Sequence, residues 1–349
     1  MIGSSIALEI LFGIPIWLGS IITVVDSLLF LFIHYFGVRK LEAFFGVLIG
    51  VMAGCFFLNF LLVKPDMGQV AFGTFVPTVP AGCLTPAIGL LGAVIMPHNL
   101  HLHSSLVLSR KTSNKREANF YNAIESAISL AISFAISFAV VGTFAHYHVG
   151  TGEAPKDLNL RNADQALAES FGAGARIVWA VGLLAAGQSS TMTGTYAGQF
   201  VMEGFLDIKL PVWKRVLTTR CVAVLPALVV AFVADYDSVD TYLNVLQAIQ
   251  LPFALLPLLK FTDSPLVMGE EFANSRRASR FAWAAALLLF LVNFVQLAVA
   301  LIGADLGPLE ITALATAVIA YLYLLGLIVR APLVRLPPAL QDEAVSKQS

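Results

Sequence analysis

About nine runs of predominantly apolar residues, each roughly 20 residues long, constrain the fold of this chain more than any other feature of its sequence. An α-helix of that length crosses the hydrocarbon core of a bilayer, which is roughly 30 Å thick. Charged residues make up only 12% of the chain, about half the share of a typical soluble domain, and the mean hydropathy is +0.82. The chain is therefore predicted to be an all-α, multi-pass membrane protein. Its predicted spans lie near residues 15–36, 41–63, 86–109, 119–145, 175–200, 216–234, 238–260, 281–303 and 309–331.

Residues 1–12 precede these spans and form a shorter apolar stretch. At about 1.5 Å per helical residue they reach roughly 18 Å, which is too short to cross the hydrocarbon core, so they resemble the second half of a helix. The sequence shows no composition break and no low-complexity tract. We therefore predict one transmembrane domain over residues 1–349, with a stub helix at 1–12, about nine full spans and a tail at 332–349.

The basic residues predict the orientation in the membrane, because cytosolic loops carry an excess of lysine and arginine. Four of the 21 basic residues fall on one side, which leaves 17 on the other. The side with 17 is predicted to be cytosolic, and it includes the C-terminus. A plasma membrane and an endosomal or vacuolar membrane fit this pattern equally. The four residues on the opposite, external side are Lys64, Lys156, Arg161 and Arg176.

Charge and cysteine content argue against several classes of protein. The net charge of −1 argues against a nucleic-acid partner. The three cysteines, Cys55, Cys83 and Cys221, are odd in number and far apart, which argues against both a disulfide framework and a zinc site. No resident cofactor is predicted.

The span near 86–109 contains a feature that an ordinary membrane helix avoids, because Pro97 lies in mid-span together with histidines at membrane depth. Proline has no N–H, so the carbonyl of Ala93, four residues earlier, loses its helical partner. A freed carbonyl is costly in hydrocarbon unless it lines a cavity or binds something. Met96 adds a soft thioether beside that carbonyl. A carbonyl oxygen and a thioether sulfur at a helix break could supply half of a transition-metal site.

An acidic residue, Glu125, lies in the span near 119–145. It sits near the predicted cytosolic end, so its side chain could reach the interface, or it could pair with an inward-facing arginine such as Arg220. The residues themselves leave both interpretations open.

Four stretches resemble motifs of the natural-resistance-associated macrophage protein (NRAMP) family of divalent-metal transporters. They lie at residues 37–45, 96–104, 187–205 and 244–254. The second contains Met-Pro-His-Asn followed by Leu-His-Ser and is similar to the family's sixth-helix signature, and the third is similar to its transport motif. The resemblance runs over nearly the whole chain. It implies a LeuT-like bundle of inverted repeats, in which the broken first and sixth helices meet at the midplane.

The resemblance also implies roles for the residues that match. The metal ligands would be the thioether of Met96 and the backbone carbonyl of Ala93. Asn244 resembles a polar tenth-helix residue that approaches the metal. His98 and His103 match histidines tied to proton movement. Arg220 resembles a ninth-helix arginine that pairs with acids on the third helix.

One part of the family pattern does not occur in this sequence. The family's first helix carries an Asp-Pro-Gly-Asn motif whose Asp and Asn bind the metal, and no Asp-Pro-Gly occurs here. By resemblance, the first two helices and half of the third are missing, which predicts a truncated member of the family. A dication at the midplane needs a buried anion to offset its desolvation. We therefore expect this sequence by itself to move no metal.

The predicted function is proton-coupled transport of divalent transition-metal ions, such as Mn²⁺ and Fe²⁺, by alternating access. Metal ions, protons and the lipid bilayer are the predicted partners, and an enzyme is not expected. The alternative is a non-transporting homologue that acts only as a binding or regulatory membrane protein. A remote alternative is a membrane di-iron oxygenase, because His98, His101 and His103 superficially resemble a histidine box. That chemistry needs several such boxes, and the chain has only six histidines.

Overall fold

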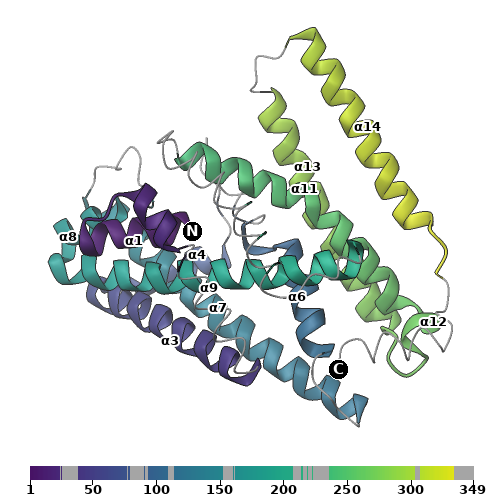
Figure 1. Ribbon diagram of the computed structural model, residues 1–349, viewed down its shortest axis with the longest axis horizontal. Helices are drawn as coiled ribbons and strands as arrows, with labels where there is room; N and C mark the ends of the chain where they lie inside the picture. Colours follow the sequence, from purple (N-terminus) through teal and green to yellow (C-terminus); the bar gives the residue numbers. More distant parts are fainter. Residues whose placement is uncertain are drawn as a thin grey trace. The chain divides into compact units, whose positions relative to one another are not determined.

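The computed structural model describes residues 1–23, 38–76, 93–108, 114–151, 162–206, 236–302 and 307–333, together with a few isolated positions between them (Figure 1). The regular elements in these ranges are all α-helices, as predicted. Among the described residues, four helical stretches are long and apolar enough to cross a membrane, or five if the bent pair at the N-terminus counts as one span. The four are Ala43–Val63, Lys115–Ala145, Arg276–Val295 and Pro308–Arg330.

Contacts divide the chain into two compact units. The first comprises Met1–Thr78 and Thr112–Asp237, and the second comprises Val79–Lys111 and Ser238–Ser349. Each unit therefore joins two segments that are far apart in the sequence. The prediction of a single domain stays a prediction.

The first unit contains α1 (Ile2–Phe12), α3 (Val38–Val63), α4 (Met67–Phe75), α7 (Lys115–Thr151), α8 (Ala163–Phe171) and α9 (Ala173–Leu206). The second contains α6 (Pro97–Leu108), most of α11 (Tyr236–Asp263), α12 (Pro265–Met268), α13 (Arg276–Ile302) and α14 (Pro308–Arg330).

Six of the predicted spans fall on one helix each, namely on α3, α7, α9, α11, α13 and α14. Most of these helices extend beyond the predicted ends, because apolar content marks the bilayer core and not the helical turns in the interface. The span near 86–109 is interrupted, and α6 occupies its second half. Most of the spans near 15–36 and 216–234 lies outside the described residues.

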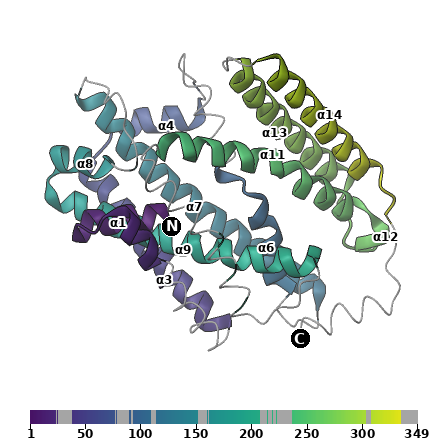
Figure 2. The ribbon, with the colours of Figure 1, turned by 45° about the horizontal axis from the view of Figure 1, so that its top comes forward.

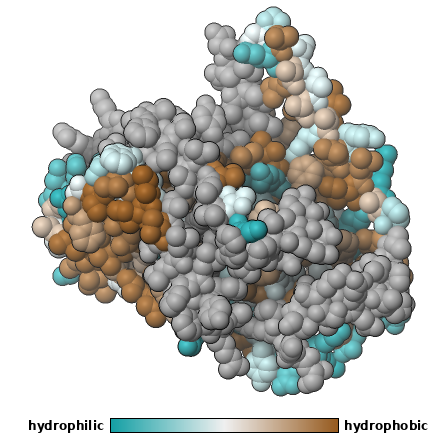
Figure 3. Space-filling model, in the orientation of Figure 1, coloured by the Kyte–Doolittle hydropathy of each residue, from teal (hydrophilic) through white to brown (hydrophobic). Residues whose placement is uncertain are grey.

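The helices of the first unit pack side by side around an aromatic core. α3 lies against both α7 and α9, and α8 lies against α9 (Figures 1 and 2). The indole of Trp179 in α9 is central, with ring centroids 5.3 Å from Phe56 of α3 and 5.1 Å from Phe144 of α7. Apolar side chains also cover the outer surface around α1 and α3, on the left of Figure 3. A lipid environment accommodates such a surface, because acyl chains are as apolar as the protein core.

α1 is followed by a sharp bend and a second short helix, Ile16–Thr23, at an angle of 119° to it. Gly13 permits the bend, because its φ of +70° lies in the left-handed region that glycine adopts without steric cost. Its N–H donates to the carbonyl of Glu9 at 2.9 Å and so closes the last turn of α1. The two short helices then fold against each other, since the hydroxyls of Ser5 and Ser20 lie 3.0 Å apart.

In the second unit, hydrogen bonds from three side chains join the start of α13 to the end of α11. The carboxylate of Asp263 accepts from Trp283 Nε1 at 2.6 Å, from Ser279 Oγ at 2.7 Å and from Asn274 Nδ2 at 3.0 Å. Partial burial raises the pKa of this carboxyl, but the three donors lower it more, so its pKa lies below the ordinary value.

This lowered pKa makes the cluster sensitive to acid. A carboxyl whose folded-state pKa is lowered contributes stability above its unfolded pKa, and loses that contribution as the pH falls through the folded-state value. We expect the melting temperature of the wild-type protein to fall more steeply below about pH 4 than that of Asp263→Asn, which has no carboxylate to protonate. Melting curves of both proteins in detergent between about pH 6 and pH 3 measure this difference. Parallel curves would contradict it.

Candidate functional site

The predicted interruption of the span near 86–109 is present in the structure. Ala93 and Val94 are helical, Met96 is not, and α6 begins at Pro97. The side chain of Pro97 is buried at the first helical position, where the missing N–H costs least. The N–H of Asn99 donates to the carbonyl of Met96 at 3.1 Å, which starts the new helix. Met96 and Ala93 are both half-buried at this break.

The histidines of α6 do not share one face. His98 is half-buried in the first turn, whereas His103 is exposed. Five residues along an α-helix correspond to a rotation of about 140°, so these two side chains leave α6 in different directions. His101, three residues after His98, lies on nearly the same side as His98 and is also half-buried. The two histidines that the sequence assigns to proton movement are therefore not brought together by the helix.

Asn244 belongs to the same compact unit as α6, although about 140 residues separate them in the sequence. Its side chain is half-buried in the first half of α11. Gln247 follows three residues later and so lies on a similar side of the helix. The amide oxygen of Gln247 is buried and has no hydrogen-bond partner among the described residues. Sequence reasoning missed Gln247, and its spacing from Asn244 was the signal that could have found it.

Neighbouring helices bond to α11 where a proline removes one of its internal hydrogen bonds. Pro252 lies inside the helix and has no N–H, so the carbonyl of Ala248 loses its helical partner. Asn293 Nδ2 of α13 donates to that carbonyl at 3.3 Å. The hydroxyl of Tyr321 in α14 donates to the adjacent carbonyl of Ile249 at 3.0 Å. The bond from Asn293 satisfies a backbone oxygen that would be costly to leave unpaired in an apolar environment, and the bond from Tyr321 links α14 to the next carbonyl.

Arg220, the remaining predicted site residue, lies outside the described residues. Its predicted pairing with acidic side chains therefore stays a prediction. Glu125 has an exposed side chain on α7. Within the described ranges, no group of three or more His, Cys, Asp or Glu side chains is arranged to hold a metal ion. The donors that the sequence assigns to the metal in this part of the chain are of other kinds, namely a thioether sulfur, an amide oxygen and a backbone carbonyl.

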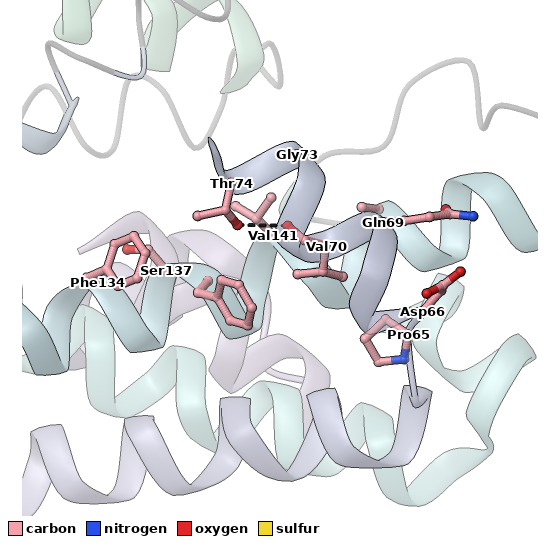
Figure 4. Close-up of a pocket in the computed structure, with 12 residues that line it drawn as sticks. Pro65, Asp66, Gln69, Val70, Gly73, Thr74, Phe134, Ser137 and Val141 are labelled. Carbon is pink, nitrogen blue, oxygen red and sulfur yellow. Dashed lines mark hydrogen bonds between the residues drawn. The ribbon is translucent and has the colours of Figure 1, made fainter. Parts of the chain in front are cut away.

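A groove of about 470 Å³ lies elsewhere, between α4 and α7 of the first unit (Figure 4). Thr74 and Gln69 line it from α4, and Phe134 and Val141 line it from α7. The carboxylate of Asp66 at its edge is engaged as the N-cap of α4, since it accepts from the N–H of Gly68 at 2.8 Å. No predicted site residue lines this groove, so we do not assign the metal site to it.

An all-helical membrane protein with a helix broken at a Met-Pro pair has the features of secondary transporters, in which discontinuous helices form the binding site. Comparison with known proteins identifies the family within this class. The natural resistance-associated macrophage protein-like family matches residues 1–299, and the chain belongs to this family.

Individual relatives agree with this assignment. A metal transporter nramp1 homolog of Dictyostelium discoideum is 46% identical, over 84% of this chain and 56% of the relative. The human natural resistance-associated macrophage protein 2 is 44% identical, over 92% of this chain and 62% of the relative. The chain therefore spans less than two thirds of the length of these relatives.

Solved structures confirm the predicted LeuT-like fold. The crystal structure of the Eremococcus coleocola manganese transporter, in complex with an aromatic bis-isothiourea compound, matches with a TM-score of 0.73 and 29% identity. The match covers 100% of this chain and 76% of that chain. The chain is thus part of an integral membrane transporter fold.

Proposed function

We propose that this chain takes part in the transport of divalent transition-metal ions, Mn²⁺ and Fe²⁺ among them, by alternating access coupled to protons. The observation that carries this proposal is the helix break at Met96 and Pro97, in a chain of this family. A relative from Dictyostelium is named a metal transporter, and the solved relative from Eremococcus is a manganese transporter. The metal ion is the substrate, and the proposal includes no resident cofactor.

The ligands in this proposal are donors that suit a borderline ion. Met96 supplies a thioether and Ala93 a backbone carbonyl, both at the break. Asn244 supplies an amide oxygen from α11, and we add the buried amide oxygen of Gln247, which has no hydrogen-bond partner in the part of the chain that the structure describes. Mn²⁺, Fe²⁺, Co²⁺ and Cd²⁺ accept such mixed sulfur and oxygen ligands, whereas Ca²⁺ and Mg²⁺ prefer shells made only of oxygen.

Proton coupling in this proposal involves His98, His103 and Arg220. Imidazole is the side chain that ordinarily changes its charge close to physiological pH. His98 lies two residues after Met96, so a dication held at Met96 would repel a proton on His98. Because of this repulsion, metal binding at Met96 favours release of a proton from His98, and loss of that proton favours metal binding. His103 would continue the pathway beyond the first turn of α6, and Arg220 is included on the family resemblance alone.

Membership in a transporter family favours this proposal over the di-iron oxygenase. The alternative is a non-transporting homologue, and an uptake experiment distinguishes it from the transport proposal. Uptake of Mn²⁺ is measured in cells that express the 349-residue chain, and in cells that express it joined to the preceding residues of the human relative. We expect uptake by the joined protein to rise as the medium is acidified. If both proteins reach the cell surface and neither raises uptake above vector alone, the transport proposal is wrong and the non-transporting alternative holds.

The proposed orientation places the C-terminus and most basic loops in the cytosol, in the plasma membrane or an endosomal or vacuolar membrane. The asymmetry of the basic residues supports it. We expect an epitope tag inserted between residues 110 and 116 to be inaccessible to antibody in intact cells. A tag inserted between residues 152 and 159 should be accessible once the protein reaches the surface. Labelling of the first tag without permeabilisation would overturn the orientation, and a cytosolic tag on a marker protein controls for membrane integrity.

A further inference from the structure

Helices α3, α8 and α9 of the first unit carry buried polar atoms that have no hydrogen-bond partner among the described residues. They are the amide oxygen and nitrogen of Asn59, one carboxylate oxygen of Asp164, Oδ1, and the indole Nε1 of Trp179. The side chains of Asn59 and Asp164 are each 2% exposed, and that of Trp179 is 6% exposed. A buried polar atom without a hydrogen-bond partner destabilises the folded state, so three such side chains on adjoining helices call for a shared explanation.

An ion pair joins Asp164 of α8 to Arg176 of α9, about one helical turn before Trp179. The other carboxylate oxygen of Asp164, Oδ2, lies 2.8 Å from Arg176 Nε. Trp179 follows Arg176 by three residues and so lies on a similar side of α9, about one turn away. Ala163, next to Asp164, packs in the same apolar cluster as Trp179.

The pairing of α3 with α9 determines which residues are level with each other. A Cβ on Gly182 of α9 would lie 2.9 Å from the ring of Phe56 in α3, so these two positions face each other closely. Further along α9, Gln188 lines the same pocket as Leu48 of α3. Later residues of α9 therefore lie beside earlier residues of α3, so the two helices run antiparallel.

This register places Asn59 level with Trp179. Asn59 lies about one turn after Phe56, and Trp179 lies about one turn before Gly182. Phe56 also contacts Trp179 directly, with ring centroids 5.3 Å apart. The register thus places the three buried polar side chains within about one helical turn of each other along α9.

We propose that Asn59, Asp164 and Trp179 bind one buried water molecule that joins α3, α8 and α9. The four unpartnered atoms comprise two donors, Trp179 Nε1–H and the Asn59 amide nitrogen, and two acceptors, Asp164 Oδ1 and the Asn59 amide oxygen. A water molecule accepts two hydrogen bonds and donates two, which matches this set. A metal cation fits poorly, because Arg176 already neutralises Asp164 and Trp179 directs an N–H into the site. Bound in this way, the water links α8 to both α3 and α9 by hydrogen bonds.

A double-mutant cycle on melting temperature tests the proposal. Trp179→Phe removes one donor and Asn59→Leu removes the amide at similar volume, and Trp17→Phe, at a side chain that is 43% exposed, is the matched control. We expect each of the two single variants to melt about 2 °C lower or more, and the double variant to lose clearly less than the two losses combined, because both lose the same water. Trp17→Phe should change little. If Asn59→Leu melts higher than wild type, its amide is an orphan, and the proposal is wrong. Fully additive losses would also reject a shared water.

Structure determination on the wild-type chain tests the same proposal without relying on the variants to fold. A cryo-EM or crystal map that resolves ordered waters should contain one density peak within hydrogen-bond distance, about 2.7–3.2 Å, of Asn59, Asp164 and Trp179. Direct hydrogen bonds among the three side chains, or apolar packing that excludes such a peak, would overturn it.

Discussion

Replacing Met96 with alanine is expected to lower the preference for Cd²⁺ over Ca²⁺ by about tenfold or more, which corresponds to about 1.4 kcal/mol. A thioether interacts well with soft and borderline ions and poorly with hard ones. Cd²⁺, the softest ion compared, should therefore lose most when the sulfur is removed. Mn²⁺ should lose less, because oxygen ligands still hold it. Ca²⁺ should gain relative to both, since water can take the place of the sulfur.

The competing interpretation is that Met96 only packs the helix break, since methionine commonly fills irregular gaps. That interpretation predicts an equal fall for all three ions, in proportion to the folded protein lost. The measurement is uptake of Cd²⁺, Mn²⁺ and Ca²⁺, normalised to surface expression, in the chain joined to the preceding residues of a relative. Met67→Ala is the matched control, because Met67 is 55% exposed on α4 in the other unit. An unchanged ratio of Cd²⁺ to Ca²⁺ would remove Met96 from the site.

Replacing Gly187 with alanine is expected to destabilise the protein strongly. A Cβ at this position of α9 would lie 2.8 Å from the backbone nitrogen of Ser4 and 3.2 Å from its Cα. Both atoms belong to the backbone of α1, so no side chain can rotate away to make room. Ser4 is fully buried as well, so α1 must shift as a whole. We expect a loss of about 1–3 kcal/mol, the cost typical of overpacking a close contact.

The same helix supplies a matched control. Gly194 is seven residues further along α9, and a Cβ there would meet nothing within 4 Å. Gly194→Ala should therefore melt at the same temperature as wild type or higher, because alanine favours a helix over glycine by roughly 0.5–1 kcal/mol. Melting curves and size-exclusion profiles of the two variants in detergent measure the difference. If Gly187→Ala and Gly194→Ala behave alike, the close approach of α1 and α9 is not a constraint on folding.

Local features of the sequence were enough to predict the helices and the break. The length of each apolar run marks a membrane helix, because every backbone polar group in hydrocarbon must bond within its own segment. The break before Pro97 was predicted from the missing N–H of proline, although the same chemistry leaves α11 continuous across Pro252. The bend at Gly13 and the loss of one helical hydrogen bond at Pro252 come from equally local chemistry. The motif that contains Met96 and His98 pointed to the family that the comparisons confirmed.

The partners of these features became visible only in the tertiary structure. The carbonyl that Pro252 frees on Ala248 is satisfied by Asn293, a residue 45 positions further along the chain. The contact of Gly187 with α1, and the contact of Phe56 with Trp179, likewise join segments that are remote in the sequence. Soluble helices reveal their buried face through alternation of polar and apolar residues, but lipid and protein interior are equally apolar. The sequence by itself therefore determined where the helices lie and where they break, while the packing of whole helices decided which faces meet, because that choice rests on many weak contacts and not on hydropathy.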